Sequence, residues 1–476
     1  MTGLTEFEKN SIERASAEIL EGYGYGITAL DLFKKIGIIS ENAGLAAYLI
    51  GGFPRDVIIY ILKFNPETSR KYKSSRVFES NPRFLDLDIA VRGSAEKLAC
   101  LIKEKKNLNF KLNYFKIHKR FGTASLEFLI NGIPLKLDLA SLRTEIYKKP
   151  GMLPEVNTAS AELKDDIRRR DFTINTVAFS INRKDFLKVY DYSSGIADIL
   201  NKKIRVMHAS SFIDDPTRMF RAVRFEKRLG FRIDGDTLKL MKIALDGNVL
   251  DGISGKRITA ELYLILKEKT PEIYFERLAQ LNIFGSIYGR LKFEKKNKTV
   301  FKKISAYFNE PEKENKLRKV CKDLDVNIFY TAAIFYGLDG GELSKALGRL
   351  NMGGRIEKTL ITIYSDMKKI DNLKANNTGI YDKINKIDVK SILFYLFEDC
   401  GRDKEDLNFR KFLLRYLNKI IFIKPYLNGH DIKSMGICEG PLCGRILNEI
   451  RLLKIKGRLK SKKDELTYVK NNYFKN

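Results

Sequence analysis

Several features common in secreted and membrane proteins are missing from this sequence of 476 residues. No apolar run approaches the roughly 18 residues that a membrane-spanning helix needs, and the polar N-terminal segment MTGLTEFEKNSIERASAE does not look like a signal peptide. The scattered, odd-numbered cysteines do not indicate a disulfide framework: Cys100, Cys321, Cys400, Cys438 and Cys443. These absences predict a soluble, cytoplasmic protein with no membrane-spanning part.

Acidic residues are scarce relative to basic ones, with 59 Asp and Glu against 87 Lys and Arg and a net charge of +28. Such an excess favours a polyanionic partner, with nucleic acid ahead of an anionic membrane surface. The length exceeds what one core usually holds, so about two to four domains are expected.

The chain changes character along its length. Residues 1–45 show helical periodicity, residues 46–180 mix strands and helices, and the pattern after about residue 200 is helical nearly to the end. A polar, basic stretch at 65–82 is typical of a flexible loop. Period-two alternation or short apolar runs predict strands at 48–52, 83–91, 111–117, 124–130 and 134–140, with a helix over 54–64.

One predicted strand, RFLDLDIAV at residues 83–91, places Asp86 and Asp88 on the face opposite its apolar residues. Taken alone, this is often a solvated strand face. PLKLDLA at residues 134–140 puts Lys136 and Asp138 on one polar face in the same way. If the two strands are neighbours, three carboxylates share one face, and hard oxygen ligands of this kind suit a pair of Mg²⁺ ions.

The segment LIGGFPRD at residues 49–56 is a candidate phosphate holder. Gly51 and Gly52 lie at a strand-to-helix turn where backbone N–H groups can approach phosphate oxygens, and Arg55 can add a charge-assisted contact. Most Gly-Gly turns are only turns, but the acidic strand some 34 residues later makes this combination more specific.

These two segments resemble the first motif of the bacterial-type (class II) tRNA nucleotidyltransferase and poly(A) polymerase family. RRRDFTINTVAF at 168–179 resembles its second motif, and the resemblance places Arg169, Arg170 and Asp171 near ribose and phosphates. Later motifs follow in family order, at residues 191–208 (with Asp191 and Gly195), 214–231, 255–262 and 427–447.

The resemblance implies an α+β fold: a small polymerase-beta-like nucleotidyltransferase α/β palm followed by an all-helical neck, body and tail. It also implies attack by an RNA 3′-hydroxyl on CTP or ATP, with Asp86 and Asp88 binding both Mg²⁺ ions and Asp138 binding one. The boundaries expected are a helical extension at 1–45, the palm at 46–180, a nucleotide-selecting neck at 181–265, a body at 266–424 and a basic tail at 425–476.

Three positions depart from the family pattern. Pro54 stands where Val is usual, Asp214 stands where Glu usually opens the fourth motif, and the loop before Asp86 is longer than usual. None of these removes a metal ligand, so an active enzyme is expected.

Asp215 and Arg218 in the fourth motif are three apart, so on a helix they would share a face and could form an intrahelical ion pair. The resemblance implies that they instead read the incoming base. A carboxylate accepts from the exocyclic amine of C or A, and an arginine donates to the adjacent ring nitrogen. Uracil and guanine present the opposite polarity at both places, which leaves buried groups unpaired.

Four further charged residues of the fourth and fifth motifs also have roles to be assigned. Arg221 and Arg224 follow on the same predicted helix and either contact phosphates or pack against the preceding domain. Arg257 and Glu261, four apart, are expected to pair with each other.

Several alternatives stay open. A poly(A) polymerase, or an enzyme limited to CC or A addition, would carry the same residues, and the family places a loop that influences product choice at 142–166. A catalytically dead RNA-binding protein would be expected to lack a carboxylate, and a small-molecule nucleotidyltransferase would lack the base-reading pair and the basic tail. In that tail, residues 445–476 hold ten basic and three acidic residues, either a clamp for tRNA or a solvated helix face. The oligomeric state cannot be read from these patterns.

Overall fold

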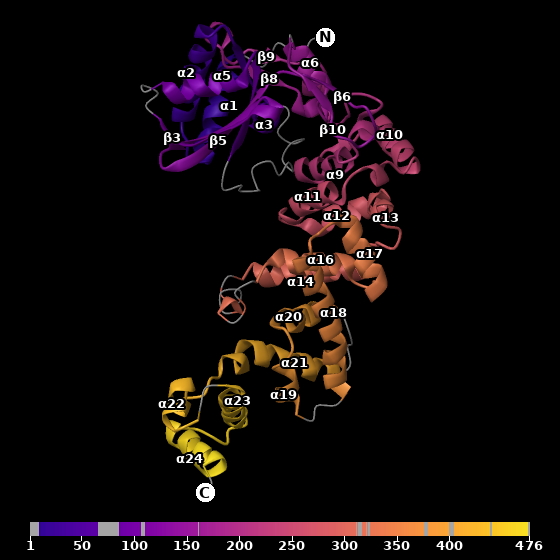
Figure 1. Ribbon diagram of the computed structural model, residues 1–476. Coiled ribbons are helices and arrows are strands. Elements are labelled where there is room, and N and C mark those ends of the chain that lie inside the picture. The colour runs from indigo at the N-terminus through magenta and orange to yellow at the C-terminus, as the bar shows by residue number, and fades with distance from the viewer. Residues whose placement is uncertain are drawn as a thin grey trace. The chain divides into compact units, whose positions relative to one another are not determined.

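The computed structural model describes residues 9–64, 85–105, 110–159, 161–310, 312, 317–319, 321, 324–375, 379–398, 404–437 and 440–474. The predicted loop at 65–82 and the side chain of Asp86 lie outside what is described. The chain divides into two compact units, Met1–Gly289 and Arg290–Asn476 (Figure 1).

The first unit contains a seven-stranded mixed sheet in the order β3-β4-β5-β2-β1-β8-β9. Strands β2 and β5 run parallel, and the other neighbouring pairs run antiparallel. The strands are β1 (Ala46–Ile50), β2 (Asp86–Arg92), β3 (Lys111–His118), β4 (Thr123–Ile130), β5 (Ile133–Ser141), β8 (Ala178–Ser180) and β9 (Val189–Tyr190). All five predicted strands are confirmed, and the sheet extends past residue 180 to β9.

The alternation that predicts these strands also determines which face is buried. On β5, Leu135, Leu137 and Leu139 are fully buried, whereas Lys136 and Asp138 between them are partly exposed. On β2, Leu87 and Ile89 are likewise buried and Asp88 is exposed. The polar face of two neighbouring strands is therefore left open for chemistry.

Helices cover the apolar side and continue the unit beyond the sheet. Helix α2 (Thr28–Asn42) packs against β1 and α5 (Ala95–Glu104), and α3 (Gly52–Phe64) packs against β1 and β2. A Cβ added at Gly37 of α2 would lie 1.7 Å from the carbonyl oxygen of Ile181, so only glycine permits this approach. The N-terminal helices are thus packed tightly onto the sheet.

The helices of this unit are α1 (Lys9–Gly22), α2 (Thr28–Asn42), α3 (Gly52–Phe64), α5 (Ala95–Glu104), α6 (Leu163–Arg168), α7 (Gly195–Leu200), α8 (Ser211–Asp214), α9 (Arg218–Leu229), α10 (Gly235–Asp246), α11 (Gly255–Leu266), α12 (Pro271–Gln280) and α13 (Ile283–Ile287). Two small sheets accompany them, the hairpin β6 (Thr144–Ile146) with β7 (Glu155–Asn157) and the pair β10 (Lys203–Ile204) with β11 (Arg232–Ile233). The mixed sheet with its many helices confirms the α+β class.

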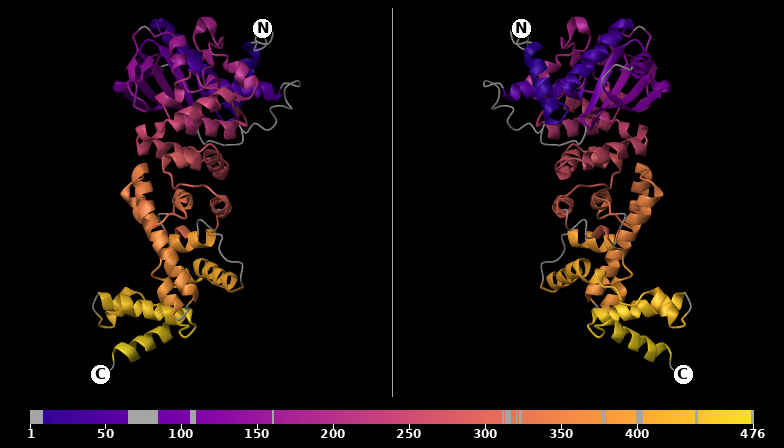
Figure 2. Two further views of the ribbon diagram at one scale, coloured as in Figure 1. Left: turned by 90° about the vertical axis from the view of Figure 1, so that its right-hand side faces the viewer. Right: turned by 90° about the vertical axis from the view of Figure 1, so that its left-hand side faces the viewer.

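The second unit is helical throughout its described part, as the orange and yellow ribbons of Figure 2 show. Its helices are α14 (Lys295–Phe308), α16 (Val326–Phe335), α17 (Gly340–Leu350), α18 (Gly354–Ala375), α19 (Ile380–Ile384), α20 (Val389–Phe397), α21 (Lys404–Asn418), α22 (Gly429–Ser434), α23 (Pro441–Ile455) and α24 (Lys462–Tyr473). Among the helices described, none combines the length and apolarity required to cross a membrane.

The last three helices enclose a small hydrophobic core of their own. Ile432, Ile446, Ile450 and Val469 are fully buried in it. Glu465 is also fully buried, and its Oε2 accepts hydrogen bonds from the backbone N–H groups of residues 426 and 427 at 2.8 Å each. The basic tail is therefore a folded element rather than a loose charged extension.

Candidate active site

Two predicted carboxylates meet at the centre of the sheet. The parallel register of β2 and β5 sets Asp88 opposite Asp138 and Asp86 opposite Lys136, which confirms that the two acidic strands are neighbours. Asp88 and Asp138 both line a pocket of about 500 Å³. The backbone thus places at least two carboxylates side by side on an open face.

These carboxylates fit a hard divalent cation by their chemistry and their access to solvent. Among the side chains that the structure describes, no three His, Cys, Asp or Glu groups gather closely enough to hold an ion. The third predicted carboxylate, that of Asp86, is outside this set. The Oδ1 of Asp138 accepts from the hydroxyl of Ser125 at 2.6 Å, and its Oδ2 lies 2.7 Å from Nζ of Lys136.

The Gly-Gly turn lies directly beside this pocket. Gly51 has a φ of +88°, which an L side chain rarely adopts, and a Cβ there would lie 3.0 Å from Oδ2 of Asp88. Gly52 begins α3. Pro54 falls in the first turn of α3, where the missing N–H costs nothing, so this departure from the family pattern is accommodated.

Arg55, predicted near the phosphates, is buried, with 5% of its surface exposed. Its Nε donates to Asp56 at 2.8 Å and its Nη1 to Asn175 at 2.7 Å, and the guanidinium lies over the ring of Phe225. In this arrangement it joins α3 to the second motif and does not line the carboxylate pocket. Its contact with nucleotide stays a prediction.

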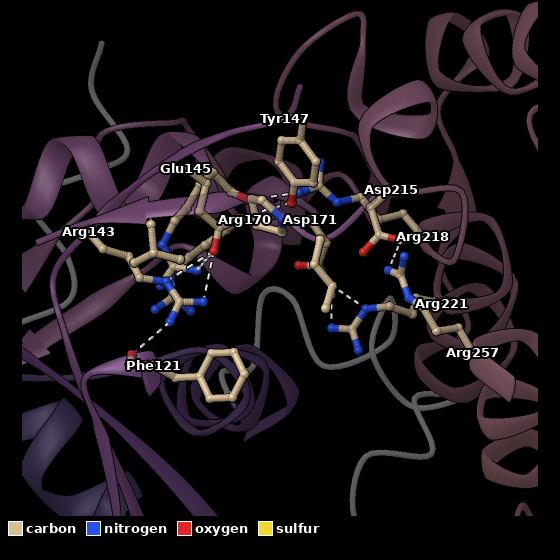
Figure 3. Close-up of a pocket in the computed structure, with 14 residues that line it drawn as sticks. Phe121, Arg143, Glu145, Tyr147, Arg170, Asp171, Asp215, Arg218, Arg221 and Arg257 are labelled. Atoms are coloured by element: carbon tan, nitrogen blue, oxygen red, sulfur yellow. Dashed lines mark hydrogen bonds and ion pairs between the residues drawn. The ribbon is translucent and has the colours of Figure 1, made fainter. Parts of the chain in front are cut away.

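A second pocket of about 360 Å³ adjoins the first, since Arg143, Arg169 and Arg170 line both. Figure 3 shows the residues that line it, with Arg143 and Glu145 at one end and Asp215 and Arg218 at the other. Two of the three shared arginines were predicted from the second motif, and Arg143 was not.

One buried carboxylate, Asp166, holds two of these arginines. It is 1% exposed, and its Oδ1 accepts from Arg169 at 2.7 Å while its Oδ2 accepts from Arg170 at 3.0 Å. Burial by itself would raise the pKa of Asp166, but the charges of Arg170 and Arg169 and their hydrogen bonds hold it below its ordinary value. The two arginines are therefore fixed toward the pockets by a group that sequence reasoning missed.

Glu145 on β6 is a second anchor that sequence reasoning missed. Its side chain is 6% exposed, and its Oε1 accepts from Arg143 at 2.8 Å and from Arg169 at 3.0 Å (Figure 3). Tyr147 donates to its Oε2 at 3.0 Å, and burial together with the charge of Glu145 raises the pKa of that phenol. The hairpin β6–β7, which lies in the segment 142–166 where the resemblance predicts a loop that influences product choice, is thus tied to the arginine cluster.

Asp171 of the second motif is bound to the fourth motif. Nε of Arg221 donates to its Oδ2 at 2.9 Å, while Asn175 and the N–H of Phe172 donate to its Oδ1 at 3.1 and 2.8 Å. Burial would raise its pKa, but the charge of Arg221 and these hydrogen bonds lower it to about 2. Besides this contact with the second motif, Arg221 lines the second pocket, and its contact with phosphates stays a prediction.

The prediction that Asp215 and Arg218 share one helix face is wrong. Asp215 has an extended backbone (φ −136°, ψ 93°) between α8 and α9, and Arg218 is the first residue of α9. The reason is Pro216, because a residue before proline is driven out of the helical region. Both side chains nevertheless line the second pocket.

Each member of this pair is held by other groups. Oδ1 of Asp215 accepts from the N–H and the hydroxyl of Thr217 and from Nη2 of Arg257, the last at 2.8 Å. Arg218 is 4% exposed, and its Nη2 donates to the carbonyl of Arg169 at 2.8 Å. The alternative of an intrahelical ion pair between them does not apply.

The predicted pairing of Arg257 with Glu261 is also wrong. Although both lie on α11, Arg257 donates to Asp215 and to the carbonyl of Gly151 at 2.7 Å. Glu261 instead accepts from Arg224 of α9 at 3.2 Å, and burial, which outweighs that arginine, raises the pKa of Glu261. Tertiary partners thus replace the local pair. Arg224 joins α9 to α11 through Glu261, and its contact with phosphates stays a prediction.

The third motif is structural. Oδ1 of Asp191 accepts from the N–H of Gly195 at 2.8 Å, and its Oδ2 accepts from the N–H of Ile196 at 2.9 Å. These bonds satisfy the start of α7. Asp214 of the fourth motif accepts from the hydroxyl of Ser210 at 2.9 Å.

The charged groups therefore follow an order across the two pockets. Asp88 and Asp138 line the first pocket, and the arginines line both. Asp215 and Arg218 line the second pocket. An elongated polyanion that carries a polar ring fits this order of charges, with the ring at Asp215 and the anionic groups at the arginines.

Comparison with known proteins gives two family matches. Residues 47–205 match the model described as the poly A polymerase head domain, and residues 230–289 match the model described as the probable RNA and SrmB-binding site of polymerase A.

Curated relatives align along most of the chain. The A-adding tRNA nucleotidyltransferase of Geobacter sulfurreducens is 28% identical over 446 residues, which cover 91% of this chain and 46% of that protein. The A-adding tRNA nucleotidyltransferase of Halalkalibacterium halodurans is 26% identical over 444 residues, which cover 93% of this chain and 92% of that protein. This chain therefore spans less than half of the first relative and nearly all of the second.

Solved structures agree with the fold. The apo form II of a CCA-adding enzyme superposes with a TM-score of 0.71 at 26% identity, covering 93% of this chain and 95% of that one. A CCA-adding enzyme complexed with ATP superposes with a TM-score of 0.70 at 25% identity, covering 95% and 97%.

Proposed function

We propose that this chain, as a member of the family of bacterial-type (class II) tRNA nucleotidyltransferases and poly(A) polymerases, adds C and/or A residues to the 3′ end of tRNA without a nucleic-acid template. In this reaction the RNA 3′-hydroxyl attacks the α-phosphate of CTP or ATP, and pyrophosphate leaves. A poly(A) polymerase acting on RNA 3′ ends is the alternative.

The observation that carries this proposal is the pair of adjoining pockets joined by three shared arginines. A nucleoside triphosphate has the matching layout, with a base at one end and phosphates at the other. Arg143, Arg169 and Arg170 are positioned by Glu145 and Asp166, so they can receive phosphate oxygens without rearranging.

The carboxylate end supplies the place for reaction. We assign both Mg²⁺ ions to Asp86 and Asp88 and one of them also to Asp138, which we assign to activation of the 3′-hydroxyl. Bound Mg²⁺ would supply neutralisation of charge on the attacking and leaving oxygens. Gly51 lets the backbone approach Asp88 closely, so the turn that faces the phosphates and the ligand that faces the ions are adjacent.

The far end selects the base. Contacts from Thr217 and Arg257 converge on Oδ1 of Asp215, which fixes the carboxylate to accept from the exocyclic amine of C or A. Arg218 is held by the Arg169 carbonyl and donates to the neighbouring ring nitrogen. Uracil and guanine would meet each group with like polarity, and the unpaired buried groups would cost binding energy.

Within the family, the relatives named A-adding tRNA nucleotidyltransferase support addition of the terminal A. Among relatives aligned over at least 86% of this chain, they are 26–28% identical, against 23% for the CCA-adding enzyme of Staphylococcus epidermidis. We therefore place A addition to a tRNA ending in CC first among the products.

The test uses three tRNA transcripts that end at the discriminator base, at C and at CC, each supplied with CTP, ATP or both. Extension of only the CC transcript by a single A is the expected result. Extension of the discriminator transcript to CCA would show that the product is the full CCA end and not a single A. Long A tails on an unrelated RNA would establish the poly(A) polymerase alternative, and no incorporation into any RNA would overturn the proposal.

A further inference from the structure

One carboxylate of the first pocket, that of Asp138, contacts a lysine that is not itself among the residues lining the pocket. Lys136 and Asp138 stand two residues apart on the same face of β5, with Nζ of Lys136 2.7 Å from Oδ2 of Asp138. Their side chains are 44% and 37% exposed, so both groups are reached by solvent. The register with β2 sets Lys136 opposite Asp86 and Asp138 opposite Asp88.

Electrostatics explains why a cation is useful there. Carboxylates on one face of adjacent strands repel each other, and an ammonium group on the same face offsets that repulsion. Ser125 engages Oδ1 of Asp138 at 2.6 Å, and Lys136 engages Oδ2. An incoming ion that uses Asp138 therefore has to displace the ammonium group from Oδ2 or share the carboxylate with it.

We propose that Lys136 is a positioning residue that acts as a built-in counter-cation of the carboxylate pocket. It engages Asp138 while the site is free of divalent ions, and it lowers the affinity of the site for them. This inference rests on the proposed function, because it takes Asp138 as a ligand. It goes beyond that function because it makes one lysine responsible for the concentration of divalent cation at which the site fills.

The test measures Mn²⁺ binding to the full chain, with free Mn²⁺ followed by electron paramagnetic resonance at low ionic strength. Lys136→Gln removes the positive charge and keeps a polar side chain that is one atom shorter. For an ion roughly 6 Å from the ammonium group, the repulsion between two charges and one at the dielectric of water predicts about tenfold tighter Mn²⁺ binding in the variant. This increase in affinity shrinks as salt is added, because the site is open to solvent.

A matched control is Lys203→Gln. Lys203 is 43% exposed and pairs with Asp234 at 3.2 Å, which is nearly the same exposure and partner as Lys136, but on β10 away from the pocket. It should leave Mn²⁺ affinity unchanged. Lys136→Gln combined with Asp138→Asn should not show the tighter binding, because the ligand that the lysine engages is gone.

Equal Mn²⁺ affinity in the parent and Lys136→Gln would overturn the inference, and so would an equal shift in Lys203→Gln or no measurable Mn²⁺ binding to the parent. Nucleotide addition by the parent is assayed separately. A parent that binds Mn²⁺ but adds no nucleotide would contradict the proposed function while the comparison of affinities still stands.

Discussion

The ion pair between Asp171 and Arg221 offers a quantitative test of how the second and fourth motifs hold together. Asp171 is 11% exposed and accepts hydrogen bonds from Arg221, Asn175 and the N–H of Phe172. Its pKa falls from 3.8 to about 2, and that difference corresponds to about 2 kcal/mol of stability at neutral pH. Asp171→Asn removes this charge and should destabilise the contact by that amount.

The sign of the pH dependence follows from the lowered pKa. Because the folded state holds Asp171 ionised more strongly than the unfolded state does, its contribution is complete above the ordinary pKa and is lost as the pH falls toward about 2. About half of it is gone by about pH 3. The difference in stability between the parent and Asp171→Asn should therefore be largest at pH 7 and shrink steadily on acidification.

Hydrogen exchange followed by mass spectrometry resolves this effect locally. A loss of about 2 kcal/mol corresponds to roughly 30-fold faster exchange in the segment around β8, while exchange in α18 to α21 should not change. Thermal unfolding by circular dichroism at pH 7 and near pH 3 gives the pH dependence. The control is Asp236→Asn on α10, since Asp236 is 79% exposed and its pair with Lys239, screened by solvent, should contribute little to stability. Equal exchange in Asp171→Asn and the control would refute the reasoning.

The remaining predictions concern the reaction and its substrate. Asp88→Ala should lower turnover by several orders of magnitude with unchanged thermal unfolding, because its side chain buries no apolar surface; near-normal incorporation would contradict the metal assignment. Asp215→Asn keeps an oxygen for Thr217 but presents an amide to the base, so misincorporation of UTP should rise; the same rejection as in the parent would show that another group reads the base. Changing the exposed tail lysines Lys456, Lys463 and Lys470 to Gln should raise the KM for tRNA and leave the KM for the nucleotide unchanged. The slope of log affinity against log salt concentration should become shallower by up to about 0.9 for each phosphate that is no longer neutralised. An unchanged slope would mark these lysines as ordinary solvated surface.

The tail prediction needs substitutions because the structure rules out the simplest deletion. Removing residues 445–476 would take away Ile446, Ile450 and Val469, which form the local core, and Glu465, which caps the preceding segment. A truncated chain would lose both this local core and the positive charge of the tail, so the effect of the charge could not be measured by itself. Among the tail's basic residues, Arg451 donates to the carbonyl of residue 423, so it serves packing.

Sequence alternation predicted which faces of the strands are polar, but not which strands are neighbours. The period-two pattern placed Asp88 and Asp138 on polar faces, and only the parallel pairing of β2 with β5 set them opposite each other. That pairing depends on long-range contacts that no local pattern encodes. The side chain of Asp86 lies outside the described residues, so its place beside them stays a prediction.

The missed anchors differ in how visible they were. Asp166 stands three and four residues before Arg169 and Arg170, a spacing that predicts helical ion pairs and was present in the sequence. For Glu145 the sequence offered only a weak signal, namely its alternation with Arg143 along a short strand. Its contact with Arg169 could not be predicted locally, because the two residues are 24 apart in the sequence.

The two wrong predictions have different causes. Pro216 keeps Asp215 out of a helix, so Asp215 and Arg218 do not share a helix face. The i, i+4 rule for Arg257 and Glu261 contributes only about 0.2–0.5 kcal/mol, and stronger tertiary partners at Asp215 and Arg224 replaced it. Local rules describe an isolated helix, whereas a helix in a site is surrounded by other charges that compete for the same groups.

The interruption of the helix at Pro216, between α8 and α9, has a consequence for how the protein responds to salt and pH. The arginine pairs around the pockets are Coulombic, so their strength varies with ionic strength and acidity. The extended backbone of Asp215 is imposed instead by the steric bulk of a covalent ring, which no ion concentration alters. Rising salt should therefore weaken the ion pairs around the pockets, including that of Arg257 with Asp215, while the backbone bend before Pro216 is kept. The place of Asp215 along the backbone thus withstands changes of solution that alter the strength of its side-chain contacts.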